Sequence, residues 1–384
     1  MKLAQYGDYI YLYILLISFI PAIILGIKGK NIKYYGVLIS ILMVGLIVGT
    51  SKNNLLLFIM FFIGELTVIY GYLLIRRKTD NKILYYLALL ASMLPVIITK
   101  VSVLTSFGPL GFIGLSYLNF KAIQMIIEIY DGAIKDIKIY TLVYFILFFP
   151  TLSSGPIDRY RRFQEDLNKK IEKREYLDEY LYVGIRKITI GLCYKFVLAF
   201  LINTFWISKI PSDITFLNGL SYMYAYSLYL FFDFAGYSSF AVGTSYILGI
   251  KTPDNFNKPF LSKDMKEFWT RWHISLSKWF GDYLYSRIVL NSMRKKRFKS
   301  RFTASHVAQI ITMLIMGIWH GLSLFYIIYG LYQGIVLVLT DIIQRKWKYY
   351  KKHKKEKWFQ YVQIAVNFNV ACFGLFLFSG WLFR

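Results

Sequence analysis

Long apolar stretches alternate with short basic segments along the chain. A helix of about 20 apolar residues crosses the bilayer core, and several stretches reach or approach that length. The predicted membrane segments are 9–25, 35–48, 55–74, 83–98, 139–152, 182–207, 220–233, 236–248, 303–319, 321–340 and 361–383. Some are short enough to enter the membrane without crossing it. The pattern therefore predicts an all-α integral membrane protein with about 11–13 embedded segments.

The composition supports the same class. Of the 384 residues, 57% are hydrophobic and 19% aromatic, well above the usual range of soluble domains. The formal net charge is +25, but Lys and Arg gather between the apolar stretches, so nucleic-acid binding is a poor interpretation of the charge. Cys193 and Cys372 lie in apolar segments without metal-ligand spacing, which predicts neither a metal site nor a disulfide framework.

The basic loops assign the two sides of the membrane. The loops 28–33 and 76–82 are rich in Lys and Arg, whereas the loop between them offers only Lys52. By the positive-inside rule these two loops face the cytoplasm, as do the later basic segments 294–301 and 345–357. Both chain termini are then predicted to be extracellular.

The segment 107–132 mixes apolar residues with amides and acids. Polar groups at membrane depth are costly unless they face protein or water, so we interpret this segment as a broken helix that lines the core; a cytosolic excursion is the alternative. No hydrophilic stretch is long enough for a second domain. We predict one polytopic domain, 1–384, with peripheral spans in 1–100, a catalytic core at about 107–345 and a final span at 358–384.

The stretch 257–287 differs from the rest because it is dense in aromatic and charged residues. At about 100° per residue it forms an amphipathic helix over 265–283, whose apolar face holds Trp269, Trp272 and His273. Such a helix suits an interface or the wall of a wet cavity better than a lipid-facing span. The histidine within the apolar face is a candidate functional group.

A second histidine lies in the motif MGIWHG, residues 316–321. His320 follows Arg301 by nineteen residues, about 28 Å of helix, which places it deep in the membrane or toward its outer side. If this helix is continuous, His306, Gln309 and His320 share one face. A lone buried histidine is more often a satisfied core residue than a catalyst, but an ionisable group at membrane depth is costly and favours a functional role.

Asp233 lies between aromatic residues in the string FFDFAGYSS. An acid at this depth is either functional and cavity-facing, or satisfied by a helix cap or by an ion pair with an arginine elsewhere in the core. The sequence leaves both interpretations open. The chain contains no nucleophile elbow, zinc-protease motif, P-loop or dinucleotide fingerprint. The chemistry left to a buried imidazole is general acid or base catalysis on a substrate hydroxyl.

The segments that carry the two histidines resemble the membrane-bound O-acyltransferase (MBOAT) family. The similar strings are FNKPFLSKDMKEFWTRWHISLSKWF and, about forty residues later, MGIWHG. The strings SSGPIDRYRRF, FFDFAGYS and IMGIWHGLSLFYIIYGLYQG are most similar to the branch of the family that attaches D-alanine to teichoic acid. The resemblance runs from about Gly111 to the C-terminus. It implies an MBOAT-type ring of transmembrane and re-entrant helices around a central tunnel.

The resemblance also implies a reaction, the transfer of an acyl group from a thioester to a hydroxyl. In this branch the donor is D-alanine on the 4'-phosphopantetheine arm of an acidic carrier protein on the cytosolic face, and no further cofactor is bound. The acceptor is (lipo)teichoic acid outside the cell membrane of a Gram-positive-type bacterium, where other D-alanylation membrane proteins are partners. His320 matches the near-invariant histidine and is predicted to take the proton from the attacking hydroxyl, while His273 orients or polarises the thioester carbonyl. The residues predicted to line the tunnel or bind the acyl donor are Trp269, Trp272, Ser275, Trp319, Asp233 and Gln309.

The basic segment 294–301 would attract an acidic carrier protein. The predicted docking residues are Arg294, Lys295, Lys296 and Arg297. A plainer interpretation is that such residues only satisfy the positive-inside rule and anionic lipid headgroups. Two other functions stay open: a polysaccharide O-acetyltransferase of the same family, and a transporter without acyl-transfer chemistry, although the inverted repeats typical of transporters are not visible.

Overall fold

The computed structural model describes residues 5–6, 9–49, 51–105 and 110–384. All regular structure within these residues is helical, which confirms the predicted all-α class. Within the described ranges, seven helical stretches are long and apolar enough to cross a membrane: Ile10–Ile27, Lys52–Lys78, Lys82–Ser102, Lys173–Lys209, Arg301–His320, Leu324–Lys346 and Lys357–Phe378. The other segments are shorter or less apolar, as expected where not every embedded helix spans.

The chain forms two compact units. The first comprises Met1–Leu192 and Gly236–Pro253, and the second comprises Cys193–Ala235 and Asp254–Arg384, so the boundary falls inside α11 (Phe216–Ile247). The other helices of the first unit are α1 (Tyr9–Ile27), α2 (Lys33–Val48), α3 (Lys52–Lys78), α4 (Lys82–Ser102), α5 (Leu115–Tyr130), α6 (Ile139–Leu147), η1 (Phe149–Thr151), α7 (Tyr160–Asn168), α8 (Lys173–Glu175), η2 (Tyr176–Leu181) and α9 (Tyr182–Leu192).

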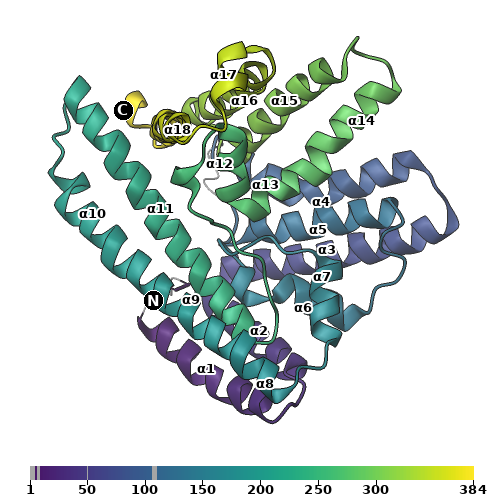
Figure 1. Cartoon of the computed structure of the whole chain (residues 1–384). Coiled ribbons are helices and arrows are strands. Elements are labelled where there is room, and N and C mark those ends of the chain that lie inside the picture. The colour runs from purple at the N-terminus through teal and green to yellow at the C-terminus, as the bar shows by residue number, and fades with distance from the viewer. Residues whose placement is uncertain (1–4, 7–8, 50, 106–109) are drawn as a thin grey trace. The chain divides into compact units, whose positions relative to one another are not determined.

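Three neighbouring helices of the first unit, α3, α4 and α5, run side by side (Figure 1). A buried carboxylate joins them: Glu65 on α3 accepts hydrogen bonds from Ser92 Oγ on α4 (2.8 Å) and from Asn119 Nδ2 on α5 (3.1 Å). Because these polar groups satisfy one another, they can lie away from water.

The polar helix α5 lines the core, as the interpretation of 107–132 requires, since thirteen of its sixteen residues are buried. The predicted break is wrong, because α5 runs without interruption from Leu115 to Tyr130. Its polar side chains bond to neighbours instead of interrupting the backbone; Gln124, for example, donates to the carbonyl of Asp158 (2.9 Å). The start of the predicted segment, 107–109, lies outside the described residues.

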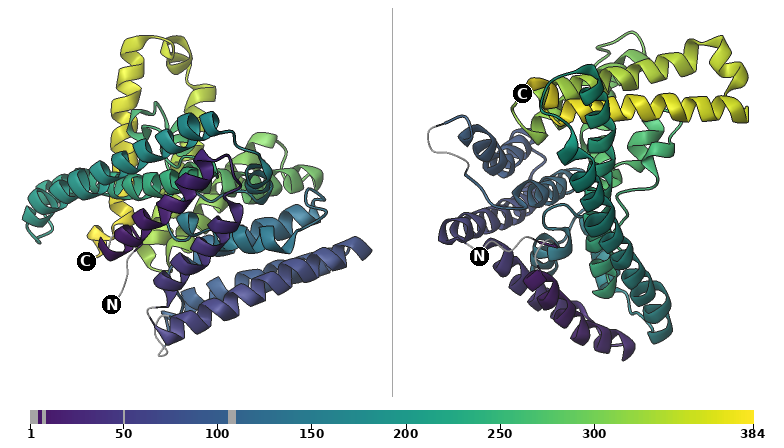
Figure 2. Two further views of the ribbon diagram at one scale, coloured as in Figure 1. Left: turned by 90° about the horizontal axis from the view of Figure 1, so that it is seen from below. Right: turned by 90° about the vertical axis from the view of Figure 1, so that its left-hand side faces the viewer.

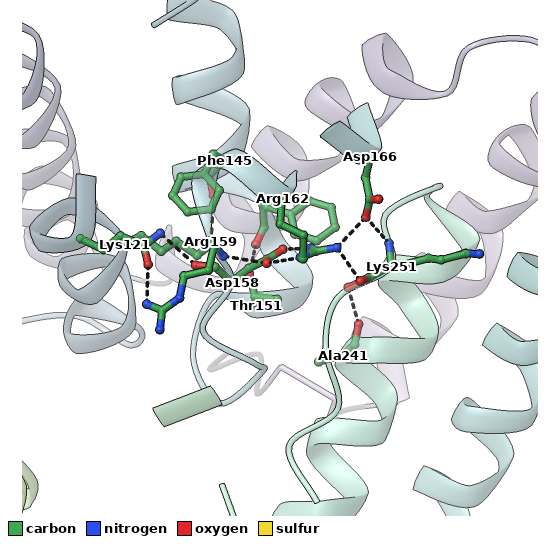
Figure 3. Close-up of polar contacts among 12 residues, drawn as sticks. Lys121, Phe145, Thr151, Asp158, Arg159, Arg162, Asp166, Ala241 and Lys251 are labelled. Atoms are coloured by element: carbon green, nitrogen blue, oxygen red, sulfur yellow. Dashed lines mark hydrogen bonds and ion pairs between the residues drawn. The ribbon is translucent and has the colours of Figure 1, made fainter. Parts of the chain in front are cut away.

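The string SSGPIDRYRRF forms a polar clamp at the start of α7. Arg162 lies between two carboxylates, Asp158, which is 1% exposed, and Asp166 at 2.6 Å (Figure 3). Asp166 also accepts the backbone N–H of Lys251 at 2.8 Å. The arginine and the two acids therefore fix α7 against the turn that follows α11.

Two predicted boundaries are wrong. The stretches 220–233 and 236–248 are one helix, α11, of 32 residues. The charge of Asp233 needs no break, because Lys195 Nζ pairs with it at 2.5 Å. The segment 139–152 is only a nine-residue helix, α6, followed by the 3-10 turn η1 at Phe149–Thr151, so it is too short to span alone.

The second unit contains the rest of the chain. Its remaining elements are η3 (Cys193–Ala199), α10 (Phe200–Phe205), η4 (Ile207–Lys209), η5 (Pro259–Leu261), α12 (Met265–Arg271), α13 (Ile274–Phe280), η6 (Gly281–Tyr285), α14 (Ser286–Arg294), α15 (Arg301–His320), α16 (Leu324–Lys346), α17 (Lys348–His353), α18 (Lys357–Phe378) and η7 (Trp381–Phe383). The helices α15 and α16 form a hairpin, and α18 packs along α16 with α17 at the turn between them (Figure 2).

Candidate active site

His273 lies at a break between two short helices, α12 and α13. The residue adopts left-handed backbone angles (φ 43°, ψ 53°), which a residue with a side chain seldom occupies and which cluster at functional sites. The predicted continuous amphipathic helix over 265–283 is therefore wrong. In a continuous helix the N–H of Ile274 would bond within the helix, but here it donates to the carbonyl of Asn255 at 2.9 Å.

Asn255 fixes this break, and sequence reasoning missed it. Its side-chain oxygen accepts two hydrogen bonds from Ser275, one from the hydroxyl (2.6 Å) and one from the backbone N–H (3.2 Å). On the other side of the break, the N–H of Asn257 donates to the carbonyl of Arg271 (2.9 Å). Ser275, predicted to line the tunnel or bind the acyl donor, is therefore a hydrogen-bond partner of Asn255. No local motif reveals the pairing, because its two partners lie twenty residues apart.

An aromatic cluster surrounds His273. The ring of Phe234 meets the imidazole edge to face, with ring centres 4.8 Å apart. Trp272 stacks on Phe268 (5.5 Å) and meets Phe256 edge to face (5.2 Å). These contacts make Trp272 a packing residue of the wall behind His273.

His320 is the last residue of α15, which is continuous from Arg301 as predicted. Its ring lies among aromatic rings, with centres 4.6 Å from Trp319, 4.9 Å from Phe378 and 6.1 Å from Tyr326. Trp319, predicted to line the tunnel, therefore packs beside the imidazole.

A close glycine crossing positions the hairpin that carries His320. A Cβ atom on Gly317 would lie 2.4 Å from the carbonyl oxygen of Tyr326 and 3.0 Å from Cα of Gly330. Only residues without a side chain allow α15 and α16 to approach this closely. Gly317, the first glycine of the MGIWHG motif, thus sets the distance between the two helices one turn before His320.

The two histidines influence each other electrostatically. Burial, together with the nearby His320, lowers the pKa of His273 to about 3, and only 4% of His273 is exposed. His273 is therefore a neutral imidazole at physiological pH. It can accept or donate a hydrogen bond without carrying charge.

A cavity of about 380 Å³ lies between the broken helix and α15. Trp269 and Ile274 line it on one side, and Gln309, Thr312 and Met316 line it on the other. It therefore extends along α15 to Met316, one turn before His320, and reaches the residue next to His273. Trp269 and Gln309 both line this cavity, and their role at a tunnel or an acyl donor stays a prediction.

Two polar atoms in this cavity have no hydrogen-bond partner among the described residues. They are Oε1 of Gln309 and Oγ1 of Thr312, both buried. Buried polar atoms without partners are costly, so they mark a place where a bound molecule would supply the missing hydrogen bonds. The neighbouring Trp269 is already satisfied, since its Nε1 donates to Gln333 Oε1 (3.2 Å).

Asp233 does not line this cavity. Lys195 neutralises it, so the ion-pair interpretation agrees with the structure, with a lysine in place of the expected arginine.

A cluster around Asp341, missed by sequence reasoning, lies at the other end of the α15–α16 hairpin. This carboxylate is 5% exposed and contacts Lys266 Nζ, His306 Nε2 (2.8 Å) and Arg345 Nε (2.7 Å). Lys266 also lines the 380 Å³ cavity. Asp341 therefore fastens α12 to α15 and α16 beside that cavity.

A second, basic cavity of about 550 Å³ lies between α14, α15 and α16. Arg301 and Arg345 supply its charge, and Tyr285 lines both this cavity and the 380 Å³ one. The predicted docking residues lie in the chain between two of the residues that line it, Leu290 and Arg301. All four are exposed, and no carboxylate in the described chain pairs with them: Arg294, Lys295, Lys296 and Arg297.

Comparisons with known proteins show the family to which the chain is similar. A family model described as MBOAT, membrane-bound O-acyltransferase family, matches residues 53–379. The teichoic acid D-alanyltransferase of Bacillus subtilis (strain 168) is 43% identical over 390 residues, covering 98% of this chain and 98% of that protein. The protein of the same name from Streptococcus thermophilus is 39% identical, covering 99% and 96%. A probable alginate O-acetylase of Pseudomonas putida is 31% identical, covering 62% and 49%.

Proposed function

The chain belongs to the membrane-bound O-acyltransferase family, and from this premise we propose that it transfers D-alanine from a carrier-bound thioester to hydroxyl groups of teichoic acid. It is a multi-pass membrane acyltransferase. The choice of D-alanine and teichoic acid rests on relatives named teichoic acid D-alanyltransferase, which this chain matches over nearly its full length. The probable alginate O-acetylase matches less than two thirds of the chain, which favours D-alanyl over acetyl transfer.

The observation that carries the proposal is one cavity that is lined by Ile274, the residue after His273, and by Met316, one turn before His320. His320 Nε2 or Nδ1 takes the proton from the acceptor hydroxyl as its oxygen attacks the thioester carbonyl carbon. A C–O bond forms, the C–S bond breaks, and the proton on His320 passes to the departing thiolate sulfur. The products are a D-alanyl ester and a free thiol, so atoms and charge balance without another reactant.

His273 plays a different part because it is neutral. A neutral imidazole held in a fixed orientation donates a hydrogen bond to the thioester carbonyl oxygen as negative charge develops there. The hydrogen bonds that Asn255 accepts from Ser275 and Ile274 support this role, since catalysis by a hydrogen-bond donor depends on a position set before the reaction.

The two cavities suit the parts of a 4'-phosphopantetheine arm. Arg301 and Arg345 in the basic cavity would bind its phosphate, and the unpartnered atoms of Gln309 and Thr312 would bond to its amides and hydroxyl. Tyr285 lines both cavities, so the arm would run past this residue. An acidic carrier protein would then dock on Arg294, Lys295, Lys296 and Arg297.

The identity of the acyl donor is the direct test of this proposal. Purified protein in vesicles is incubated with a teichoic acid acceptor and either D-alanyl carrier protein or acetyl-CoA, each labelled in its acyl group. The proposal predicts transfer of label to the acceptor from the carrier protein and little from acetyl-CoA. Transfer from acetyl-CoA alone would identify an O-acetyltransferase, and transfer from neither donor would contradict both acyl-transfer assignments.

A further inference from the structure

The first unit contains a cavity of about 150 Å³ that the proposed acyl transfer does not use. Three segments line it: residues 29–33, which lead from α1 into the first residue of α2, residues 166–171 at the end of α7 and just after it, and residues 248–250 after α11. Its lining includes the buried residues Ile32, Tyr176 and Ile250. A single water needs about 10–15 Å³, so this cavity has room for a group of several heavy atoms.

Lysines provide the charge of this cavity. Among the described residues, four lysines and one acid line it: Lys30, Lys33, Lys169 and Lys170, with Asp166. That acid is already used by the polar clamp, where Arg162 (2.6 Å) and the N–H of Lys251 (2.8 Å) bind its carboxylate (Figure 3). Asp166 therefore does not neutralise the lysines.

Two of the four lysines have no acidic partner among the residues that the structure describes. Lys169 pairs with Glu175, and Lys170 lies 3.5 Å from Glu172. Lys30 and Lys33 have no ion pair within the described residues. Among the described residues of the lining, these two are the lysines without an ion pair.

The ammonium of Lys33 is instead held over aromatic rings, 5.0 Å from the centre of Tyr34 and 5.7 Å from that of Tyr140. These contacts restrict the side chain at the edge of the cavity. A cation whose side chain is already restricted loses less conformational entropy when it binds an anion.

The cavity adjoins the end of a membrane span. The candidate span Ile10–Ile27 ends two residues before Gly29, and Gly26 of that helix lines the cavity. A Cβ on Gly26 would lie 2.3 Å from the ring of Tyr176, so α1 packs directly on the cavity wall. Lipid phosphates lie at this level of a bilayer, next to the ends of spanning helices.

We propose that this cavity binds the phosphodiester headgroup of an anionic glycerophospholipid, with Lys30 and Lys33 pairing with the phosphate. The position at the end of a span favours a lipid over free phosphate. This binding is separate from acyl transfer, so it stands or falls on its own measurement.

Lipid binding to the purified full-length chain tests the proposal. Native mass spectrometry follows retention of phosphatidylglycerol or phosphatidylcholine by the wild type, by Lys30→Gln/Lys33→Gln and by the control Lys78→Gln/Lys82→Gln. The control also removes two exposed lysines at the ends of spans, α3 and α4, but neither lines the cavity. At about fivefold for each lysine near an anionic surface, the first variant should bind phosphatidylglycerol about 25-fold more weakly.

The control variant and Lys30→Arg/Lys33→Arg should retain the wild-type preference for phosphatidylglycerol. Equal losses in the glutamine variant and the control would overturn the proposal, as would equal retention of phosphatidylcholine by the wild type. Addition of inorganic phosphate is the last arm. Displacement of the lipid by millimolar phosphate would show that the cavity takes free phosphate and would contradict the lipid assignment.

Discussion

The hydroxyl of Ser275 donates a 2.6 Å hydrogen bond to the side-chain oxygen of Asn255, and this contact holds the turn that carries His273. The backbone carbonyl of Asn255 accepts a hydrogen bond from the N–H of Ile274, the residue after His273. Asn255 therefore supplies hydrogen-bond partners to the backbone on the C-terminal side of the break. The left-handed conformation of His273 thus depends on a residue outside its own helices.

Asn255→Ala should reduce D-alanyl transfer by about 100-fold, because a catalytic group displaced by about 1 Å can lose that much rate. The measurement is transfer by the purified variant in vesicles from D-alanyl carrier protein. Asn257→Ala is the matched control: the nearby Asn257 contributes its backbone N–H, which the substitution leaves in place. Equal transfer activity of the two variants would show that the Asn255 side chain does not position His273 for the reaction.

Gly317→Ala should destabilise the second unit by about 1–3 kcal/mol, because its Cβ would press on the carbonyl oxygen of Tyr326 and on Gly330 and force α15 from α16. The measurement is the apparent Tm of the purified protein. Gly64→Ala, in α3, is the control, since its Cβ would meet no atom within 4 Å and it should raise Tm slightly. An unchanged Tm for Gly317→Ala would contradict the close crossing.

Thr312→Val tests the proposed contact between the cavity and the donor arm. The buried hydroxyl has no partner among the described residues, so its removal should leave the stability unchanged or raise it by about 1 kcal/mol. The KM for D-alanyl carrier protein should nevertheless rise severalfold, because a hydrogen bond to the arm is lost. Thr340→Val is the control, since that hydroxyl bonds to the carbonyl of Val336 and does not line the cavity. A wild-type KM for Thr312→Val would exclude the contact.

The depressed pKa of His273 predicts a pH-dependent stability. The folded protein keeps the imidazole neutral down to about pH 3, whereas the unfolded chain protonates it near 6.5. Its contribution to stability is therefore complete above pH 6.5 and is lost as the pH falls toward 3, by up to about 1.4 kcal/mol per pH unit.

His273→Asn removes this titration and keeps a residue that tolerates the left-handed conformation. Between pH 7.5 and 5.5, the apparent Tm of the wild type should fall more than that of the variant. Parallel Tm curves would show that His273 is not held neutral by burial. The same variant should lose most of its transfer activity at every pH.

The hairpin and its histidine were predictable from the sequence because the signals are local. The apolar run that begins after Arg301 has the length of one span, and the spacing of Gln309 and His320 on a single helix places both on one face. The structure has that continuous helix, and Gln309 lines the cavity that ends one turn before His320.

The break at His273 was not predictable in the same way. A period of 3.6 residues fits 265–283, yet the backbone leaves the helix where the 255–257 segment offers other hydrogen-bond partners. Asp233 illustrates the opposite error. The sequence suggested that a helix ends at this acid, but α11 continues through it because Lys195 neutralises its charge. Both errors arise from tertiary contacts that a local pattern does not contain. The ring of helices around a tunnel, the carrier protein and the placement of the termini stay predictions.

The central claim is that His320 is the general base of acyl transfer, and His320→Ala tests it most directly. Membranes with wild-type amounts of the variant, verified by Tm and quantitative blotting, are supplied with D-alanyl carrier protein and teichoic acid. His306→Ala is the control, a histidine on the same helix that pairs with Asp341. We expect His320→Ala to lower the formation of D-alanyl ester by at least about 100-fold, with His306→Ala far less affected. Wild-type ester formation by folded His320→Ala would contradict the account.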